Sequence, residues 1–226
     1  MNRILELLIC VPTVLIALTF HECAHGFVAY KLGDPTAKAM GRLSLNPIKH
    51  LDPIGAICML LCGFGWARPV PIDPRYFKYR KLGMAISALA GPLSNLLLAF
   101  FGCLLYSFSW NLLSGHSFHT NFIYYLALAW LTFIENFAWL NIALAIFNLI
   151  PLPPLDGSRI FSVFLPEKQY FGLMRYESYI AIGFFIILLV DSRFLGGILT
   201  GWLSFLVNFV FNGMSLPFDL IFGLIF

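Results

Sequence analysis

Two histidines four residues apart, with a glutamate beside the first, are the side chains of this sequence best suited to chemistry. They form the run His21-Glu22-Cys23-Ala24-His25 inside an apolar stretch. On a helix, positions i and i+4 share one face, so both imidazoles can bind one Zn²⁺ while Glu22 takes a proton from a metal-bound water. The alternative is two histidines satisfied by polar groups within a helix bundle. The stretch has the length of a membrane span, where ionisable side chains are costly and rarely lack a function, and this favours the metal site.

The composition indicates an all-α, polytopic membrane protein. Hydrophobic residues make up 60% of the 226 residues and charged residues 11%, with a mean hydropathy of +0.84. A soluble domain has about a quarter charged residues. We therefore expect one membrane-embedded domain over residues 1–226, with its motifs at roughly 10–165 and C-terminal helices at 166–226. The first apolar run is expected to be a retained span, since no small-residue cleavage site follows it.

The cysteines are expected to be free thiols. There are five, an odd number, and all lie in or beside apolar segments. Cys58 and Cys62 are four residues apart, but no histidine or acid is near them in the sequence. We interpret this pair as packing residues rather than metal ligands.

The apolar segments predict about five transmembrane helices and one segment that enters the membrane without crossing it. They lie at about 4–31, 53–66, 83–110, 122–150, 178–191 and 194–211. The second is shorter than the ~20 residues that a spanning helix needs, and both of its flanks are basic, so it is predicted to be re-entrant or interfacial.

The basic residues also predict the sidedness of the loops. The loop at 111–121 has no Lys or Arg, which suits the outer side of a membrane. The N-terminus is then outside, and segment 194–211 returns to the cytoplasm. The Phe-rich tail after Pro217 could form a further interfacial helix.

Two short stretches are predicted to be membrane-associated β-strands. Residues 42–45 alternate polar and apolar side chains before the turn signal Asn46-Pro47. Residues 66–71 are rich in proline, which suits an edge strand or an extended loop.

A third metal ligand is expected, because a catalytic zinc commonly has three protein ligands and one water. His25 and His21 precede Lys31, the cytoplasmic end of the first span, by six and ten residues, which is roughly 9 and 15 Å of helix. The best candidate at this depth is Asp156, on a proline-rich loop that follows the fourth apolar segment. Its alternative role is the N-cap of a helix at 157–165.

Three further polar residues lie in or at the ends of the apolar segments. Asn95 follows Gly91-Pro-Leu-Ser, and Asn148 ends the segment 122–150. Such amides can hold helices together or donate to a developing oxyanion, and the residues alone favour the first role. Glu135 lies in the middle of a span on a different helix face from Asn148, and its role is unexplained.

Taken together, these motifs resemble the site-2 protease family of intramembrane zinc metalloproteases. The resemblance covers roughly residues 10–165 and rests on His21-Glu-Cys-Ala-His25, Gly91-Pro-Leu-Ser-Asn95, and Asn148 followed by Pro-Pro-Leu-Asp156-Gly157. It implies one Zn²⁺ per chain bound by His21, His25 and Asp156, with Glu22 as general base. It moves Asn95 and Asn148 towards substrate positioning or oxyanion stabilisation.

The resemblance also implies the partners and the location. The substrates would be transmembrane segments of other proteins, cut in the lipid bilayer of a bacterial inner membrane, with the active site towards the cytoplasm. Residues 39–70 could hold an unwound substrate by strand addition. No PDZ insertion or nucleotide-binding tail is expected, and no nucleic acid is expected as a partner.

Two other functions remain open. A metal transporter could use intramembrane histidines as a transit site, but it would have ligands spaced along a pathway, whereas these cluster at one depth. An inactive relative could bind membrane spans without cutting them. Such a relative would typically have lost Glu22 or a metal ligand, and this chain retains all of them.

Overall fold

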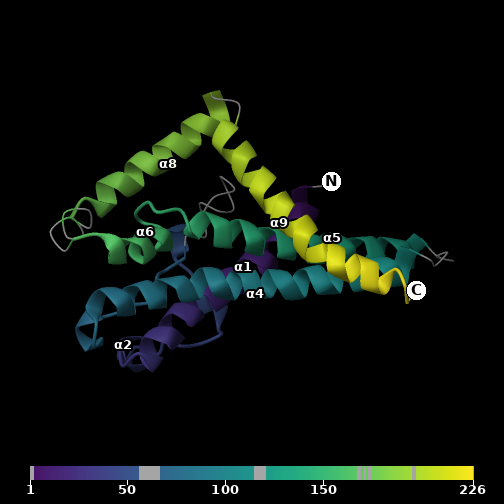
Figure 1. Cartoon of the computed structure of the whole chain (residues 1–226). Coiled ribbons are helices and arrows are strands. Elements are labelled where there is room, and N and C mark those ends of the chain that lie inside the picture. The colour runs from purple at the N-terminus through teal and green to yellow at the C-terminus, as the bar shows by residue number, and fades with distance from the viewer. Residues whose placement is uncertain are drawn as a thin grey trace.

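The computed structural model describes residues 3–55, 67–114, 121–166, 169, 172, 175–194 and 197–225, and this part of the chain is mostly helical (Figure 1). The helices are α1 (Arg3–Lys31), α2 (Thr36–Ala39), α4 (Arg80–Ser114), α5 (Asn121–Asn148), α6 (Asp156–Phe161), α8 (Glu177–Phe194) and α9 (Ile198–Phe222). The described residues also form three short 3-10 helices: η1 (Pro47–Lys49), η2 (Pro74–Tyr76) and η3 (Ser162–Phe164).

Four of these helices are long and apolar enough to cross a membrane, namely α1, α4, α5 and α9. The prediction of a polytopic all-α protein is therefore confirmed. The fifth expected crossing, 178–191, corresponds to α8, whose sequence carries charged residues at 177, 191 and 193 and which is not among the four. The count of five crossings stays a prediction.

The expected strands do not form in the described residues. Residues 43–45 are bends, with Ser44 N–H donating to the Arg42 carbonyl (3.0 Å), and residues 42–45 form no ladder with a partner strand. The prediction of a strand there is wrong. The described part of 66–71 is extended and contributes one isolated antiparallel bridge, Leu51 with Ala67. Most of the predicted re-entrant segment 53–66, with Cys58, Cys62 and Trp66, lies outside the described residues.

Helix α4 is the centre of the bundle, and it packs against α1, α5, α6 and α9. Small side chains allow this close packing, because without a hydrophobic driving force in lipid, helices associate through tight van der Waals contact. A Cβ on Gly102 would lie only 2.9 Å from the Cβ of Ala138 on α5. One core cluster joins α4, α5 and α9 through Ala99, Ile142 and Val207.

The direction of α9 differs from the sequence-based topology. Gly197 adopts φ 73°, and Asp191 accepts hydrogen bonds from the Leu199 (3.0 Å) and Thr200 (3.1 Å) N–H groups, so α8 turns sharply into α9 (Figure 1). From this turn α9 runs in the same direction as α4, and a Cβ on Gly223 would lie 3.7 Å from Asn111 Oδ1. The end of α9 therefore lies beside the Ser114 end of α4, and the predicted direction of segment 194–211, antiparallel to α4, is wrong.

The tail after Pro217 is also not a separate helix. Residues up to Phe222 continue α9 through Pro217. The missing N–H of a proline removes one hydrogen bond of the helix, but it does not end α9 here.

We predict that Gly102→Val destabilises the bundle, because the added side chain would collide with Ala138. Overpacking of this kind costs about 1–3 kcal/mol. Thermal unfolding of the detergent-solubilised protein should show a midpoint lower by several degrees. Gly213→Val on α9 is the matched control, since a Cβ there meets nothing within 4 Å. Equal losses in the two variants would contradict close α4–α5 packing at Gly102.

Candidate metal centre

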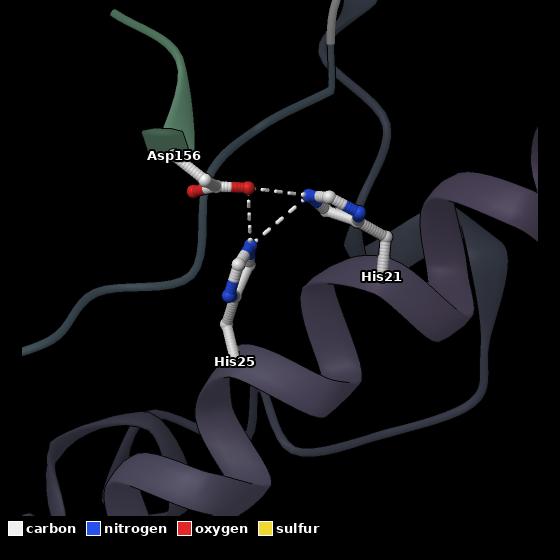
Figure 2. Close-up of side chains that lie close together, drawn as sticks. All are labelled: His21, His25 and Asp156. Atoms are coloured by element: carbon white, nitrogen blue, oxygen red, sulfur yellow. Dashed lines mark hydrogen bonds and ion pairs between the residues drawn. The ribbon is translucent and has the colours of Figure 1, made fainter. Parts of the chain in front are cut away.

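The two histidines lie on one face of α1 and point to the same place. His21 and His25 are one helical turn apart and are only 5% and 7% exposed. Their Nε2 atoms are 3.0 Å apart, and the two rings meet edge to face (Figure 2). The i, i+4 spacing therefore brings both rings together, as the sequence predicts.

Asp156 completes the cluster from the other side of the bundle. Its Oδ2 lies 3.1 Å from His21 Nε2 and 3.2 Å from His25 Nε2 (Figure 2). The N-cap of α6 is Leu155, and Asp156 is the first helical residue. The carboxylate is thus turned towards the histidines, and the alternative of an N-cap at Asp156 is not what the structure shows.

A tight turn between α5 and α6 brings Asp156 to this position. Prolines at 151, 153 and 154 prevent a regular helix after Asn148. Gly157 allows α6 to fold back onto this turn, because a Cβ there would overlap the carbonyl groups of Leu149 and Ile150. The Asp-Gly pair therefore has two functions, one in the cluster and one in the backbone.

The hydrogen bond on the far side of His25 sets its tautomer. His25 Nδ1 lies 2.7 Å from the Ser87 carbonyl oxygen, which can only accept. In neutral His25 the proton therefore sits on Nδ1, and Nε2 presents a lone pair to the cluster. Backbone carbonyls commonly orient metal-binding histidines in this way.

The three converging atoms fit a zinc ion. A tetrahedral Zn²⁺ with N and O ligands at about 2.0–2.1 Å has ligand atoms about 3.3 Å apart, close to the spacings of 3.0, 3.1 and 3.2 Å found here. The donor set of two imidazoles and one carboxylate leaves the fourth position of such an ion open, as in catalytic zinc sites. Among the residues described, this is the one cluster of three possible metal ligands.

Glu22 lies beside the cluster but is not part of it. Its half-buried side chain lines the same cavity, of about 240 Å³, as His21, His25 and Asp156. Glu22 Oε2 accepts a hydrogen bond from the Val70 N–H (2.8 Å). Glu22 therefore places a carboxylate, a possible proton acceptor, in the same cavity as the three candidate ligands.

The two predicted amides differ in their position. Asn148 lines the cavity, and its Nδ2 donates to the Leu144 carbonyl one turn earlier (2.9 Å). Asn95 is fully buried within α4 and is not among the residues that line the cavity. Its Nδ2 has no hydrogen-bond partner in the described part of the chain. Glu135 is exposed on α5 and does not line the cavity either.

Sequence reasoning missed the role of Gly91 and of the segment that carries Val70. A Cβ on Gly91 would overlap the ring of His25 and lie 2.6 Å from His21 Cε1, so α4 packs directly against both imidazoles. The glycine at position 91 belongs to the motif Gly91-Pro-Leu-Ser-Asn95, but it indicates a close helix contact only when α4 is already known to pack against α1. Arg159 and Glu177, an ion pair (3.6 Å) that also lines the cavity, gave no signal.

Comparison with known proteins defines the class. The model of peptidase family M50 matches residues 9–190. This chain therefore belongs to peptidase family M50, the site-2 protease family expected from its motifs, and the described helices and comparisons make it a metalloprotease of that family with membrane helices.

Individual relatives have the same character. "Putative zinc metalloprotease YwhC" of Bacillus subtilis is 44% identical over 186 residues, covering 82% of this chain and 81% of the relative. "Putative zinc metalloprotease Rip2" of Mycolicibacterium smegmatis is 29% identical over 162 residues, covering 69% and 57%. The Rip2 protein of Mycobacterium tuberculosis H37Rv is 26% identical over 203 residues, covering 88% and 71%. No solved structure matches this chain.

We predict that Gly91→Ala disrupts the metal centre. The added methyl group would push both imidazoles away from Asp156, so the purified protein should bind Zn²⁺ at least about tenfold more weakly. Gly201→Ala on α9, where a Cβ meets nothing within 4 Å, is the control. Competition with a zinc chelator measures both affinities. Wild-type affinity in Gly91→Ala would mean that α4 does not constrain the rings.

Proposed function

We propose that this chain is an intramembrane zinc metalloprotease, which hydrolyses peptide bonds within or near transmembrane segments of other membrane proteins. The observation that carries this proposal is the cluster of His21, His25 and Asp156 with Glu22 beside it, inside a bundle of spanning helices. Membership of family M50 and the names of the relatives support the protease chemistry. The intramembrane substrate and a role in regulated proteolysis are part of the proposal.

The proposed roles follow from the geometry of the site. His21, His25 and Asp156 would hold one Zn²⁺ per chain. When bound, the ion would act as a Lewis acid that polarises the scissile carbonyl and makes water a better nucleophile. Glu22 would take a proton from the attacking water and later deliver it to the leaving amine.

The polar residues around the cavity would position the substrate. Asn148 lines the cavity, so we propose that it contacts the substrate or its developing oxyanion. Asn95 keeps this role only if the helices or its side chain rearrange, because it is buried away from the cavity. A helical substrate must unwind first, since its peptide groups are otherwise occupied by hydrogen bonds within the helix.

We predict that Glu22→Gln abolishes cleavage and leaves zinc bound. Glutamine keeps the size of the side chain but cannot accept the proton, so the rate should fall by about two to four orders of magnitude. The contrasting variant is Asp156→Ala, which should lower the zinc content because it removes a ligand.

The test is co-expression with candidate single-span proteins, followed by metal analysis of the purified variants. Near-normal cleavage in Glu22→Gln, with contaminating proteases excluded, would refute the proposed base. Zinc binding without any cleavage by the wild-type chain would favour an inactive relative, and metal flux in liposomes would favour a transporter.

We further propose that the protein lies in a bacterial inner membrane with the metal centre towards the cytoplasm. The basic residues that flank α1 and α4 near the metal centre support this orientation. The bacterial origin of the relatives supports the location.

We predict the corresponding pattern of cysteine labelling in a variant that lacks the five natural cysteines. An impermeant maleimide applied to intact cells should label Ser114→Cys, at the far end of α4, and should label Ile48→Cys only after permeabilisation. Leu224→Cys, which replaces a 90% exposed side chain at the end of α9, should behave like Ser114→Cys. Labelling of Ile48→Cys from outside would overturn the orientation. A difference between positions 114 and 224 would overturn the direction of α9.

A further inference from the structure

The segment at 67–73 lies next to the metal centre without contributing a ligand to it. Three of its residues, Pro69, Val70 and Ile72, line the cavity together with Glu22. The segment is extended and has no ladder of its own, apart from the isolated bridge at Ala67. Its position must therefore be set by contacts with other parts of the chain.

Both ends of the segment are fixed by the region that follows α1. At one end, Arg68 N–H donates to the His50 carbonyl (2.8 Å). At the other, Asp73 N–H donates to Oδ2 of the fully buried Asp34 (2.7 Å). Asp34 is itself held by the Thr36 N–H (2.9 Å), at the start of α2. The ends are thus tied to a folded element.

A buried arginine holds the middle of the segment. Arg42 is only 8% exposed, and one of its terminal nitrogens donates to the carbonyl oxygens of Arg68 (2.6 Å) and Pro69 (3.2 Å). Burial lowers the pKa of the Arg42 guanidinium, the Arg68 charge lowers it further, and Glu22 raises it. Burying a guanidinium is costly unless it is paired or hydrogen-bonded. The hydrogen bonds to these two carbonyls therefore stabilise the buried Arg42 side chain.

Between these anchors lies the hydrogen bond to Glu22. The Val70 N–H donates to Glu22 Oε2 (2.8 Å), and Val70 is largely buried. Its neighbours Pro69 and Pro71 have no N–H. Val70 N–H is therefore the single backbone donor within residues 69–71, and it donates its hydrogen bond to the carboxylate of Glu22, beside the candidate metal ligands.

We propose that Arg42 and the Val70 N–H are positioning groups for Glu22: Arg42 fixes residues 68–69, and the Val70 N–H then holds one carboxylate oxygen so that the other is available for proton transfer. This inference deepens the proposed function and rests on it for the role of Glu22. In the described part of the chain the hydrogen bonds of these two groups go to residues other than His21, His25 and Asp156, so their loss should disturb proton transfer without disturbing metal binding. A misplacement of about 1 Å can lower a rate by about 10²-fold.

The first test removes the donor without removing the apolar contact. Val70→Pro deletes the N–H, whereas Val70→Ala keeps it and removes the methyl groups that pack towards Gly26. We expect Val70→Pro to lower kcat about 10–100-fold with KM, zinc affinity and thermal midpoint close to wild type. Val70→Ala also alters the cavity wall but keeps the donor, so it should lower kcat by a clearly smaller factor than Val70→Pro. Equal losses of kcat in both variants, or a loss of zinc from Val70→Pro, would overturn the proposal.

The second test acts from Arg42 and does not depend on a proline. Arg42→Met removes every donor, while Arg42→Lys keeps a cation that can reach one carbonyl, so the lysine variant should recover part of the lost kcat. If Arg42 acts through the Val70 N–H, the double variant Arg42→Met with Val70→Pro should be no slower than the slower single variant. Losses that multiply would show independent effects and would overturn the proposed connection.

A third measurement separates this proposal from the proposed function, because it needs no activity. Hydrogen exchange resolved by fragmentation reports Val70 cleanly, since Pro69 and Pro71 have no exchangeable amide. We expect slow exchange at Val70 in the wild type and in Arg42→Lys, and faster exchange in Arg42→Met and Glu22→Ala. This pattern would support the positioning contacts even if the chain cut no substrate. Fast exchange in the wild type would refute them even in an active protease.

Discussion

The close approach of three ligand atoms within a buried site is the constraint on which the other features depend. Two imidazole nitrogens and a carboxylate oxygen lie within 3.2 Å of one another, with both histidines almost fully buried. A single cation can bind all three atoms at once, whereas a single proton cannot bridge them. The proton of neutral His25 is on Nδ1, where it is donated to the Ser87 carbonyl on the other side of the ring. The packing of the helices must therefore bring these three atoms together.

The surrounding fold can be understood as support for that geometry. Helix α1 supplies both histidines, α4 packs on them at Gly91, which has no Cβ, and the proline-rich turn after α5 brings Asp156 back to them. The extended segment at 67–73 then covers the glutamate of the same motif. Four stretches that are distant in the sequence therefore meet at one site, and a change in the packing of α4 would affect all of them.

The sequence predicted the local features well and the long-range ones poorly. The i, i+4 spacing of His21 and His25 is a property of one helix, and the depth of Asp156 follows from the length of the spans, so both could be derived without coordinates. The direction of α9 could not, because it depends on a turn at Gly197 and on a cap by Asp191 that hydropathy does not report. The prediction of a strand at 42–45 was wrong because the alternation of polar and apolar side chains does not show whether a partner strand is available for hydrogen bonding. The contact of Gly91 with the two histidines could not be predicted either, because the sequence does not show which helices are neighbours.

The prolines at 69 and 71 have a consequence for how a peptide could lie in the cavity. Strand addition along residues 39–70, which the family resemblance implied, requires free backbone donors at regular intervals. From 68 to 71 the chain has N–H groups at Arg68 and Val70 alone, and both are already engaged, as are the carbonyls of Arg68 and Pro69. This wall of the cavity therefore presents apolar side chains rather than an unpaired strand edge. Under the proposed function, this wall would contact an unwound peptide through the apolar side chains of Pro69, Val70 and Ile72 rather than through backbone hydrogen bonds.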